Sequence, residues 1–554
     1  MKSKSTNRKT VHVIDIFSGP GGLSEGFSRF GEDDWGLKLA PELERRSWVD
    51  PHDIEFRIGL SIEKDEVAHK TLTLRAFVRQ FAPGQLPKEY YDFLSGKLKL
   101  AQLYEVYPAE AKVAAQEAWN FTLAKNEKSR NQVDERIVDA LADAGDDWCL
   151  LGGPPCQAYS LVGRARNKGI KDYDPEEDER HFLYQEYLRI VAKHRPAIFV
   201  MENVKGLLSS KIGEGRIFEK ILRDLENPRA ATGADGEKLR YRIVSVVTGK
   251  QGTLTLQDAA ALRKDGKQFI LRAEDLGIPQ ARHRVILLGI RSDIEVDEAA
   301  LPRLVRREQV GIESVLSGLP KLRSSVSNRK RTTETWFSAL KAILDEPWFL
   351  RLSVSETEVF EKMRDVLRGL EKNGTGSGND WLVPTTSDPK YMAEWFVDPK
   401  LNGVTNHHAR SHMPSDLQRY FFAACFAEVH KRSPTLEDFP DALLPQHKNA
   451  TRAKVKEGAA FNDRFRVQTK KNPSTTITSH ISKDGHYYIH YDMKQCRALT
   501  VREAARLQTF PDNYFFCGSR TEQYHQVGNA VPPLLAVQLA AVVAQILKNK
   551  KKPT

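Results

Sequence analysis

Cys156 is the residue of this sequence best placed to do covalent chemistry. It lies in the segment Gly-Gly-Pro-Pro-Cys-Gln-Ala-Tyr-Ser at 152–160, directly after an apolar run at 148–151 that predicts a strand. Two prolines stiffen the loop, and a thiolate nucleophile needs such a fixed position. A lone cysteine is more often an inert, buried, small apolar side chain. The rigid turn and the strand end favour the nucleophile here.

A second segment suited to ligand binding is the glycine-rich loop at 18–22, which follows an apolar run at 11–17. Gly19, Gly21 and Gly22 let the backbone turn sharply and approach a ligand closely. A dinucleotide-binding fingerprint needs another glycine where Ser24 stands, which argues against NAD or FAD. Phe17 is placed to stack on a flat ring. A plain tight turn is the alternative explanation of the loop.

The first 300 residues alternate apolar runs with helical patterns, which is typical of an α/β sheet with helices on both faces. The runs lie at 11–17, 148–151, 197–201, 241–247 and 285–290. Ligands of such sheets bind outside the carboxyl ends of the strands. Asp15, Cys156 and Glu202 are therefore expected to meet at one edge. About one βα unit after the first strand, Glu63 is the candidate carboxylate for ribose hydroxyls.

These features resemble the DNA (cytosine-5) methyltransferase family of the bacterial modification type. That family has a Phe-x-Gly-x-Gly-Gly loop, a Pro-Cys-Gln loop, a Glu-Asn-Val strand end and a Gln-x-Arg-x-Arg segment. It ends with an Arg-Glu-x-x-Arg-Leu-Gln helix and a Gln-x-Gly-Asn-x-Val-Pro-Pro stretch. All six occur here in family order, at 17–22, 155–157, 202–204, 280–284, 502–508 and 526–533. One match would mean little, but six in order make accident improbable.

The resemblance implies transfer of a methyl group from S-adenosylmethionine to carbon 5 of cytosine within a specific double-stranded DNA sequence. The target base would be flipped out of the duplex. Cys156 would add to C6 of the ring, and Glu202 would stabilise the ring at N3. Arg282 and Arg284 would hold the base and its phosphate near the nucleophile; a surface salt bridge is the alternative for each.

S-adenosylmethionine is the implied cofactor, in a class I, Rossmann-like, doubly wound sheet. Its predicted contacts are Asp15, Phe17, Gly19, Gly21, Gly22, Glu63, Leu183, Asn529 and Val531. The family's acid at the adenine amino group has no matching motif here, and spacing alone suggests Asp134. The chemistry needs no metal, so the histidines at 407, 408, 412, 480, 486 and 490 are interpreted as ordinary strand and loop residues.

The chain has 554 residues, which is too long for one compact core. Residues 1–300 and 476–554 are expected to form the catalytic and cofactor-binding domain, with a helical insertion at about 71–147 and a second insertion at about 33–57. Residues 301–475 are expected to be the inserted, smaller target-recognition domain that binds DNA.

The composition suits a polyanionic partner, because the net charge is +11 and the sequence pI is near 9.1. Between 447 and 471, eight Lys or Arg residues face two acids, with Phe461 and Phe465 among them. This segment is interpreted as a phosphate-contacting surface, with a solvated charged face as the alternative.

The five cysteines are scattered, and the first ten residues have no apolar core, so a cytoplasmic protein without a membrane partner is expected. The apolar stretch at 534–547 predicts a core helix. The expected partner is double-stranded DNA, with a restriction endonuclease acting on the same site, and the expected state is a monomer.

Three other functions remain as alternatives. A close branch of the family methylates transfer RNA and carries a Cys-Phe-Thr signature, whereas this chain has Cys-Phe-Ala at 425–427. A binding module that lost catalysis would not need both Cys156 and Glu202. A Rossmann oxidoreductase does not fit the missing third glycine.

Overall fold

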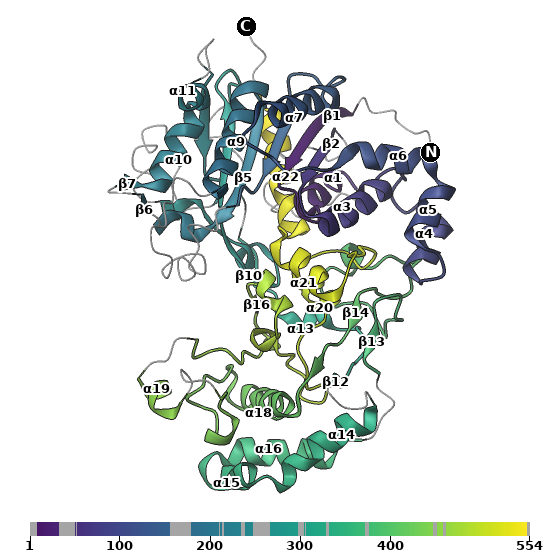
Figure 1. Cartoon of the computed structure of the whole chain (residues 1–554), viewed down its shortest axis with the longest axis vertical. Helices are drawn as coiled ribbons and strands as arrows, with labels where there is room; N and C mark the ends of the chain where they lie inside the picture. The colour runs from purple at the N-terminus through teal and green to yellow at the C-terminus, as the bar shows by residue number, and fades with distance from the viewer. Residues whose placement is uncertain are drawn as a thin grey trace.

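The structure is a computed structural model. It describes residues 8–32, 50, 53–155, 179–209, 211–212, 215–233, 239–247, 266–296, 304, 306–327, 332–371, 376–446, 451–457 and 461–550. The described chain forms a sheet lobe, which contains the central sheet with the first and last described elements, and a distal lobe of helices (Figure 1).

The sheet lobe is built on one eight-stranded sheet. Its strands are β1 (Lys9–Ile16), β2 (Ile54–Glu63), β3 (Ala118–Asn120), β4 (Cys149–Gly152), β5 (Ile198–Val204), β8 (Tyr241–Val244), β9 (Ile270–Arg272) and β11 (His283–Arg291). The order is β3-β2-β1-β4-β5-β11-β8, and β9 pairs with β11. Strands β1 to β5 are parallel, while β11 is antiparallel to its neighbours. The predicted doubly wound α/β sheet is confirmed, and its order reverses between β1 and β4.

Helices cover both faces because the central strands are buried on both sides. In β1, Val11 and Val13 pack against α1 (Gly22–Ser28) and α22 (Pro533–Lys548). Ile14 and Ile16 point to the other face, which is covered by α7 (Glu127–Ala140), α9 (Glu179–His194) and α10 (Ile217–Glu226). Alternate residues of one strand thus serve two cores.

The stretch Arg520–Lys548 is long and apolar enough to cross a membrane, but 94% of its most apolar window is buried inside the protein. It contains α22, which Figure 1 shows running through the sheet lobe in yellow. The predicted core helix at 534–547 is confirmed.

The segment expected to be a helical insertion at 71–147 has two parts. Helices α3 (Glu66–Val78), α4 (Lys88–Leu94), α5 (Leu100–Val106) and α6 (Pro108–Glu117) form a small separate core, which Leu401, Phe515 and Cys517 complete. The second part, β3 and α7, is not an insertion. Strand β3 is an edge strand of the main sheet, and α7 covers that sheet. A strand of three residues carries too little alternation to be recognised in the sequence.

Helix α4 braces the connection between the lobes. Trp381 stacks on Phe515, with ring centroids 5.4 Å apart, and meets the edge of Phe93 in α4. The Leu382 N–H donates to the Leu94 carbonyl at 3.0 Å. These contacts fix the strand-like segment that leads toward the distal lobe.

The distal lobe is helical. It contains α14 (Thr333–Lys341), α15 (Pro347–Ser355), α16 (Thr357–Arg368), α18 (Pro414–His430) and α19 (Arg452–Lys456). Its core also contains Ile489, Met493 and Cys496, which lie after the expected domain boundary at 475. Conversely, Trp395 and Phe396 pack into the core of the sheet lobe. The boundary is therefore not a single point in the sequence, because the chain crosses between the lobes several times.

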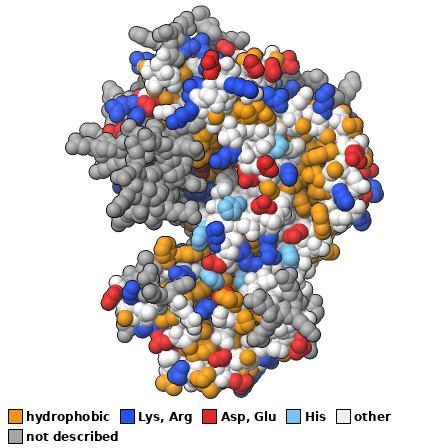
Figure 2. All heavy atoms as spheres, in the orientation of Figure 1, with side chains coloured by type: hydrophobic (Ala, Val, Ile, Leu, Met, Phe, Trp, Pro, Cys, Tyr) orange, Lys and Arg blue, Asp and Glu red, His pale blue; other side chains and the backbone are white. Residues whose placement is uncertain are grey.

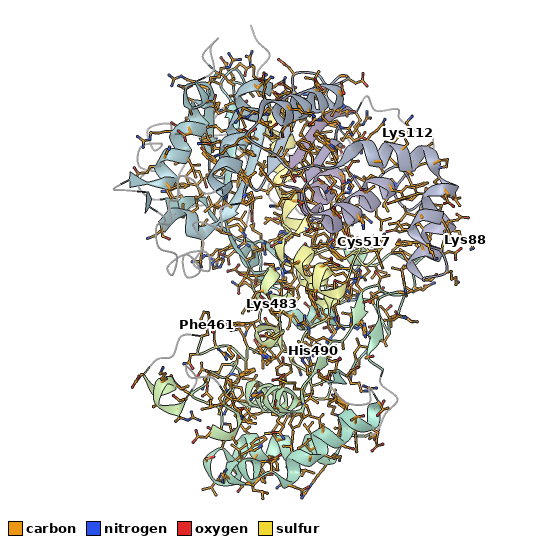
Figure 3. All side chains as sticks on the ribbon, viewed as in Figure 1. Lys88, Lys112, Phe461, Lys483, His490 and Cys517 are labelled. Carbon is orange, nitrogen blue, oxygen red and sulfur yellow. The ribbon has the colours of Figure 1, made fainter. Side chains whose placement is uncertain are left out.

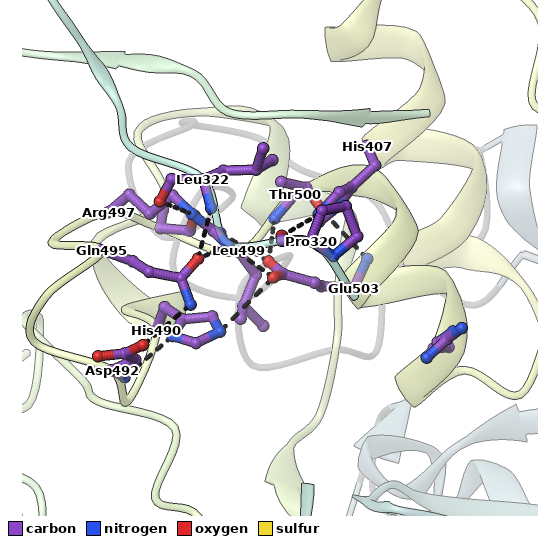
Figure 4. A network of polar contacts seen from close by, with 12 residues as sticks. Pro320, Leu322, His407, His490, Asp492, Gln495, Arg497, Leu499, Thr500 and Glu503 are labelled. Atoms are coloured by element: carbon purple, nitrogen blue, oxygen red, sulfur yellow. Dashed lines mark hydrogen bonds and ion pairs between the residues drawn. The ribbon is translucent and has the colours of Figure 1, made fainter. Parts of the chain in front are cut away.

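A buried polar network joins the lobes (Figure 4). Arg497 donates two hydrogen bonds of 2.7 Å to Glu503, which caps α20 (Val501–Leu507) through the N–H of Thr500. Burial alone would raise the pKa of Glu503, but the Arg497 charge holds it below its usual range. The bidentate ion pair therefore remains charged inside the protein.

Two of the six histidines that were interpreted as ordinary strand and loop residues belong to this network. His407 contacts Thr500 Oγ1 at 2.9 Å and the Pro320 carbonyl at 3.0 Å, and His490 lies 3.5 Å from Glu503. Burial lowers the pKa of each histidine to about 4, so both are neutral near pH 7. Within the described ranges, no group of three potential metal ligands occurs.

Candidate active site

The candidate site lies at the carboxyl edge of the sheet, where the strand order reverses. Ile16 of β1 pairs with both Ile62 of β2 and Gly152 of β4, and Gly152 pairs with Met201 of β5. The residues that follow these four positions therefore lie along one edge. Because β11 runs the other way, its first residues reach the same edge, with Arg284 opposite Val204.

The glycine-rich loop after β1 folds back onto the end of β2. The Ser18 N–H donates to the Ile62 carbonyl at 3.1 Å, and the Gly19 N–H donates to Glu63 Oε2 at 2.8 Å. Phe17, Gly19 and Gly21 have φ of 61°, 56° and 97°. This left-handed backbone costs glycine little, but it strains Phe17 by about 1–2 kcal/mol. The loop holds a sharp turn beside a carboxylate.

Two glycines of this loop have different surroundings. A Cβ on Gly22 would lie 2.1 Å from the carbonyl oxygen of Val531, whereas a Cβ on Gly19 would meet nothing within 4 Å. Tyr514 also donates its hydroxyl to the carbonyl of Pro20. The returning C-terminal segment thus packs against Gly22 and leaves open space beside Gly19.

Glu63 is half-buried at the end of β2. Its carboxylate accepts the N–H groups of Gly19 and Asp65, each at 2.8 Å, and burial raises its pKa. Carboxylate oxygens can accept further hydrogen bonds, such as those from ribose hydroxyls. Glu63 thus lies beside the glycine loop, and its role at the ribose stays a prediction.

Asn120 is a candidate ligand-binding residue at this edge that the sequence did not reveal. It is exposed at the end of β3 and pairs in register with Glu63. Its amide nitrogen donates to the carbonyls of Glu63 and Lys64, at 3.0 and 3.2 Å, so Oδ1 is the acceptor of the side chain. Only recognition of the short strand β3 could have revealed it.

Asp134, suggested by spacing for the adenine contact, does not suit that role. It lies on α7, and its carboxylate is bound by Arg189 at 2.9 Å, Lys193 at 2.7 Å and His194 at 2.7 Å. Burial opposes ionisation, but these partners hold the pKa of Asp134 well below its usual range. The carboxylate joins α7 to α9.

Asp15 is fully buried at the end of β1. Its Oδ2 accepts the Ser24 hydroxyl at 2.5 Å, and its Oδ1 has no hydrogen-bond partner among the described groups. Burial raises the pKa of Asp15 to about 7. In this arrangement Asp15 holds Ser24 at the start of α1 from inside the protein, and its predicted cofactor contact stays a prediction.

The remaining predicted cofactor contacts are less closely grouped. Leu183 is half-buried on α9 against the core under the sheet, and Val531 is half-buried where it meets Gly22. Asn529 is exposed at the last residue of α21 (Arg520–Asn529).

The structure pairs Glu202 with Arg284. Glu202 Oε1 lies 2.7 Å from Arg284 Nε, and each side chain is 14% exposed. A Cβ on Gly153, in the loop after β4, would lie 3.3 Å from Glu202 Oε2. The Asn203 amide also donates to the Pro154 carbonyl at 3.1 Å. The described start of the Pro-Pro loop is therefore held directly beside Glu202.

Cys156 lies outside the described residues, which stop at Pro155 in this loop. Its predicted role as a nucleophile stays a prediction.

Arg282 is placed differently from Arg284. It is 2% exposed, and it donates to the main-chain carbonyls of Ile477 at 2.9 Å and Gly528 at 3.4 Å. Burial, with the charge of Arg284, lowers the pKa of Arg282 to about 9. In this arrangement Arg282 joins backbone segments behind the site and does not offer its guanidinium to a substrate.

The neighbouring Gln280 extends this framework. Its amide nitrogen donates to Gln508 Oε1 at 2.9 Å, and its Oε1 accepts the Ile477 N–H at 2.7 Å. Gln508 in turn donates to the Val527 carbonyl at 2.6 Å. Three of the six sequence motifs are thus hydrogen-bonded to one another.

The two glycine positions lead to a prediction. Gly22→Ala forces a clash with the Val531 carbonyl, so we expect the Tm to fall, with overpacking costing about 1–3 kcal/mol. Gly19→Ala leaves the packing intact, but its φ of 56° strains an alanine by about 1–2 kcal/mol, so its Tm should also fall. Only this variant should raise the KM for the expected cofactor S-adenosylmethionine, because its methyl group enters the open space. Thermal unfolding and steady-state kinetics of both variants check this. An unchanged KM in Gly19→Ala would show that the cofactor does not use that space.

The chain is similar to known proteins along most of its length. The profile of the family described as "C-5 cytosine-specific DNA methylase" matches residues 100–228 and 265–545. The chain is 31% identical over 552 residues to the type II methyltransferase M.Bpa9945I of Bacillus paralicheniformis, covering 97% of this chain and 99% of that one. It is 26% identical over 437 residues to the DNA (cytosine-5-)-methyltransferase M.ApeKI of Aeropyrum pernix, covering 72% and 81%. A solved DNA modification methyltransferase encoded within an E. coli prophage aligns with 97% of this chain and 99% of its own, at 17% identity and a TM-score of 0.45.

Proposed function

The chain belongs to the C-5 cytosine-specific DNA methylase family, and from this premise we propose that it uses S-adenosylmethionine to methylate a cytosine within one specific double-stranded DNA sequence. Its relatives are named as type II methyltransferases, so the activity belongs in a restriction-modification context. A restriction endonuclease for the same DNA site is the partner that this context suggests. We expect the enzyme to act in the cytoplasm, where bacterial DNA lies.

The pairing of Glu202 and Arg284 beside the Pro-Pro loop is the observation that carries the proposal. Carbon 5 of cytosine is a poor nucleophile, so the ring must first be activated. The Cys156 thiolate would form a bond to C6. The ring electrons displaced toward N3 would take up a proton there from the protonated Glu202 carboxyl, which leaves Glu202 as a carboxylate beside Arg284. Arg284 holds the Glu202 carboxyl in place from the start of β11. A flipped cytosine bound next to Glu202 and Arg284 would contact the Cys156 thiolate and the Glu202 carboxyl at the same time.

S-adenosylmethionine supplies an electrophilic methyl group when it is bound. Once C5 carries the methyl group, its proton would pass to a water molecule, and the electrons of that C–H bond would form the C5–C6 double bond again. The bond to Cys156 would break in the same elimination, with the electron pair returning to sulfur as the thiolate. A flipped base is needed because the target atoms are otherwise stacked inside the duplex. Arg282 would serve as a positioning residue, because it holds backbone segments behind the site.

The carboxyl edge provides groups that fit the proposed cofactor. Glu63 offers a half-buried carboxylate for the ribose, and Gly19 lies beside open space. Phe17 offers a half-buried ring, and Asn120 offers an amide oxygen acceptor for the adenine amino group. Asn529 and Val531 would approach from the C-terminal segment.

Methyl transfer from tritiated S-adenosylmethionine tests this function. The protein is incubated with duplex DNA of mixed sequence and, separately, with transfer RNA. We expect label in DNA, recovered as 5-methylcytosine, and sequencing of the methylated product gives the recognised site. Label in RNA alone would overturn the DNA assignment, and label in neither would overturn the enzymatic proposal.

A further inference from the structure

Phe461 is an exposed aromatic residue that the chemistry above does not use. It exposes 66% of its side chain, although its aromatic neighbour in the sequence, Phe465, is 2% exposed. The sequence offered both phenylalanines as parts of a phosphate-contacting surface, but Phe465 is a core residue packed against Phe439. Only Phe461 of this pair is presented to a partner.

The backbone at Phe461 is held in an unfavourable conformation. Its φ is 62°, which is left-handed and costs a residue with a side chain about 1–2 kcal/mol. A glycine or asparagine would adopt it more easily. Because the ring is exposed, its burial contributes no stability that would offset this backbone strain. Strained residues of this kind cluster at functional contacts.

The turn that carries Phe461 is rigidly mounted. The Arg464 N–H donates to the Phe461 carbonyl at 3.2 Å, and the Leu436 N–H donates to the Asn462 carbonyl at 2.8 Å. Tyr487 donates its hydroxyl to Asp463 at 3.0 Å. With Phe465 anchored in the core, the turn cannot fold the Phe461 ring back into the lobe.

Phe461 lies on the side of the distal lobe that faces the sheet lobe, and Lys483 lies along the same side (Figure 3). Figure 2 shows the surface hollowed between the two lobes, with Lys, Arg and His side chains near the inner end of the hollow. From 461 to 483 the chain has five Lys or Arg residues and one acid. A DNA duplex seated in the hollow would bring its phosphates to the Lys and Arg side chains there and its bases within reach of the ring.

Resting on the proposed DNA methylation, we infer that Phe461 is an aromatic wedge that stacks on a base at the target site and stabilises the unstacked duplex. Every base offers a flat face to an aromatic ring, so stacking does not require hydrogen-bond readout. Apolar wedges of this kind lower the free energy of opening a base step. Phe461 is thus a positioning residue that favours the flipped state of the cytosine.

The test compares Phe461→Ala with Phe461→Trp and Val354→Ala on duplex DNA containing the site found by product sequencing. Val354 is 89% exposed on α15, at the far end of the distal lobe, and serves as the matched control. We expect Phe461→Ala to lose roughly tenfold or more in kcat/KM, because each stacked base contributes on the order of 1–3 kcal/mol. The Trp and Val354 variants should keep wild-type activity, and thermal unfolding should show all of them folded.

A second substrate separates wedging from simple binding. When the target cytosine faces an abasic site, the base is already poorly stacked, so Phe461→Ala should regain most of the wild-type rate. Equal losses on both substrates, or no loss on the duplex, would overturn the wedge. Failure of the DNA methylation proposal would instead appear as an inactive wild-type protein.

Discussion

Cys156→Ser should abolish methyl transfer, with a loss on the order of 10³-fold or more in kcat. Serine keeps the size of the side chain, but its hydroxyl is hardly ionised near pH 7, whereas a thiol is readily converted to a thiolate. Without addition to C6, carbon 5 of cytosine does not become nucleophilic. Binding of S-adenosylmethionine and of DNA should change little. Single-turnover methyl transfer and separate binding titrations measure the two effects.

Covalent trapping provides the direct test of the nucleophile. Release of Cys156 requires carbon 5 to lose a proton, and fluorine at carbon 5 cannot leave as a cation. Duplex DNA with 5-fluorocytosine at the target should therefore become covalently attached to the wild-type enzyme and not to Cys156→Ser. Cys149→Ser is the matched control, because Cys149 is buried in β4 just before the same loop, and burial raises the pKa of its thiol. A trapped adduct in Cys156→Ser would exclude Cys156 as the nucleophile.

Five strands of the central sheet could be predicted because they are mostly apolar runs. The neighbouring β2, whose sequence IEFRIGLSIE mixes polar and apolar residues, was not predicted, and it begins inside the segment expected to be an insertion at 33–57. Val11 to Ile16 are buried on both faces, and a run of this kind ending in a glycine turn indicates a buried parallel strand. The edge strand β3 has three residues and gives no such signal, which is why Asn120 was missed and Asp134 was suggested in its place. Spacing along the chain does not measure position along a sheet.

The sequence motifs could not predict which of their side chains are buried. Arg282 and Arg284 differ by two positions and share one motif, yet one is enclosed by main-chain carbonyls and the other pairs with Glu202. Phe461 and Phe465 show the same contrast in the distal lobe. In each pair the difference comes from segments far away in the sequence. Residue types therefore indicated the chemistry, and tertiary packing decides which residue of each pair is available for it.

Glu202→Ala should lower kcat by roughly 10²–10⁴, the usual range for losing a group that acts on a proton in the transition state. The KM for S-adenosylmethionine should stay close to the wild-type value, because Glu202 lies by the Pro-Pro loop and Arg284, and not among the groups around Gly19. Glu202→Gln keeps the shape but cannot provide an ionisable proton, so it should recover only part of the rate. Single-turnover kinetics on DNA carrying the target site gives these values.

The pair can be tested as a unit with a double-mutant cycle. If Arg284 acts by holding Glu202, then Arg284→Ala should lose activity, and adding Glu202→Ala should cost little more than the larger single loss. The control is Asp293→Asn, because Arg291 pairs with Asp293 at the same 2.7 Å at the opposite end of β11. That ion pair lies away from the carboxyl edge, so its loss should leave kcat unchanged. Additive losses from Glu202 and Arg284 would instead mean that Arg284 contacts the substrate independently. If Arg284 acts only through Glu202, the two residues make one shared contribution, and the second substitution has nothing further to remove.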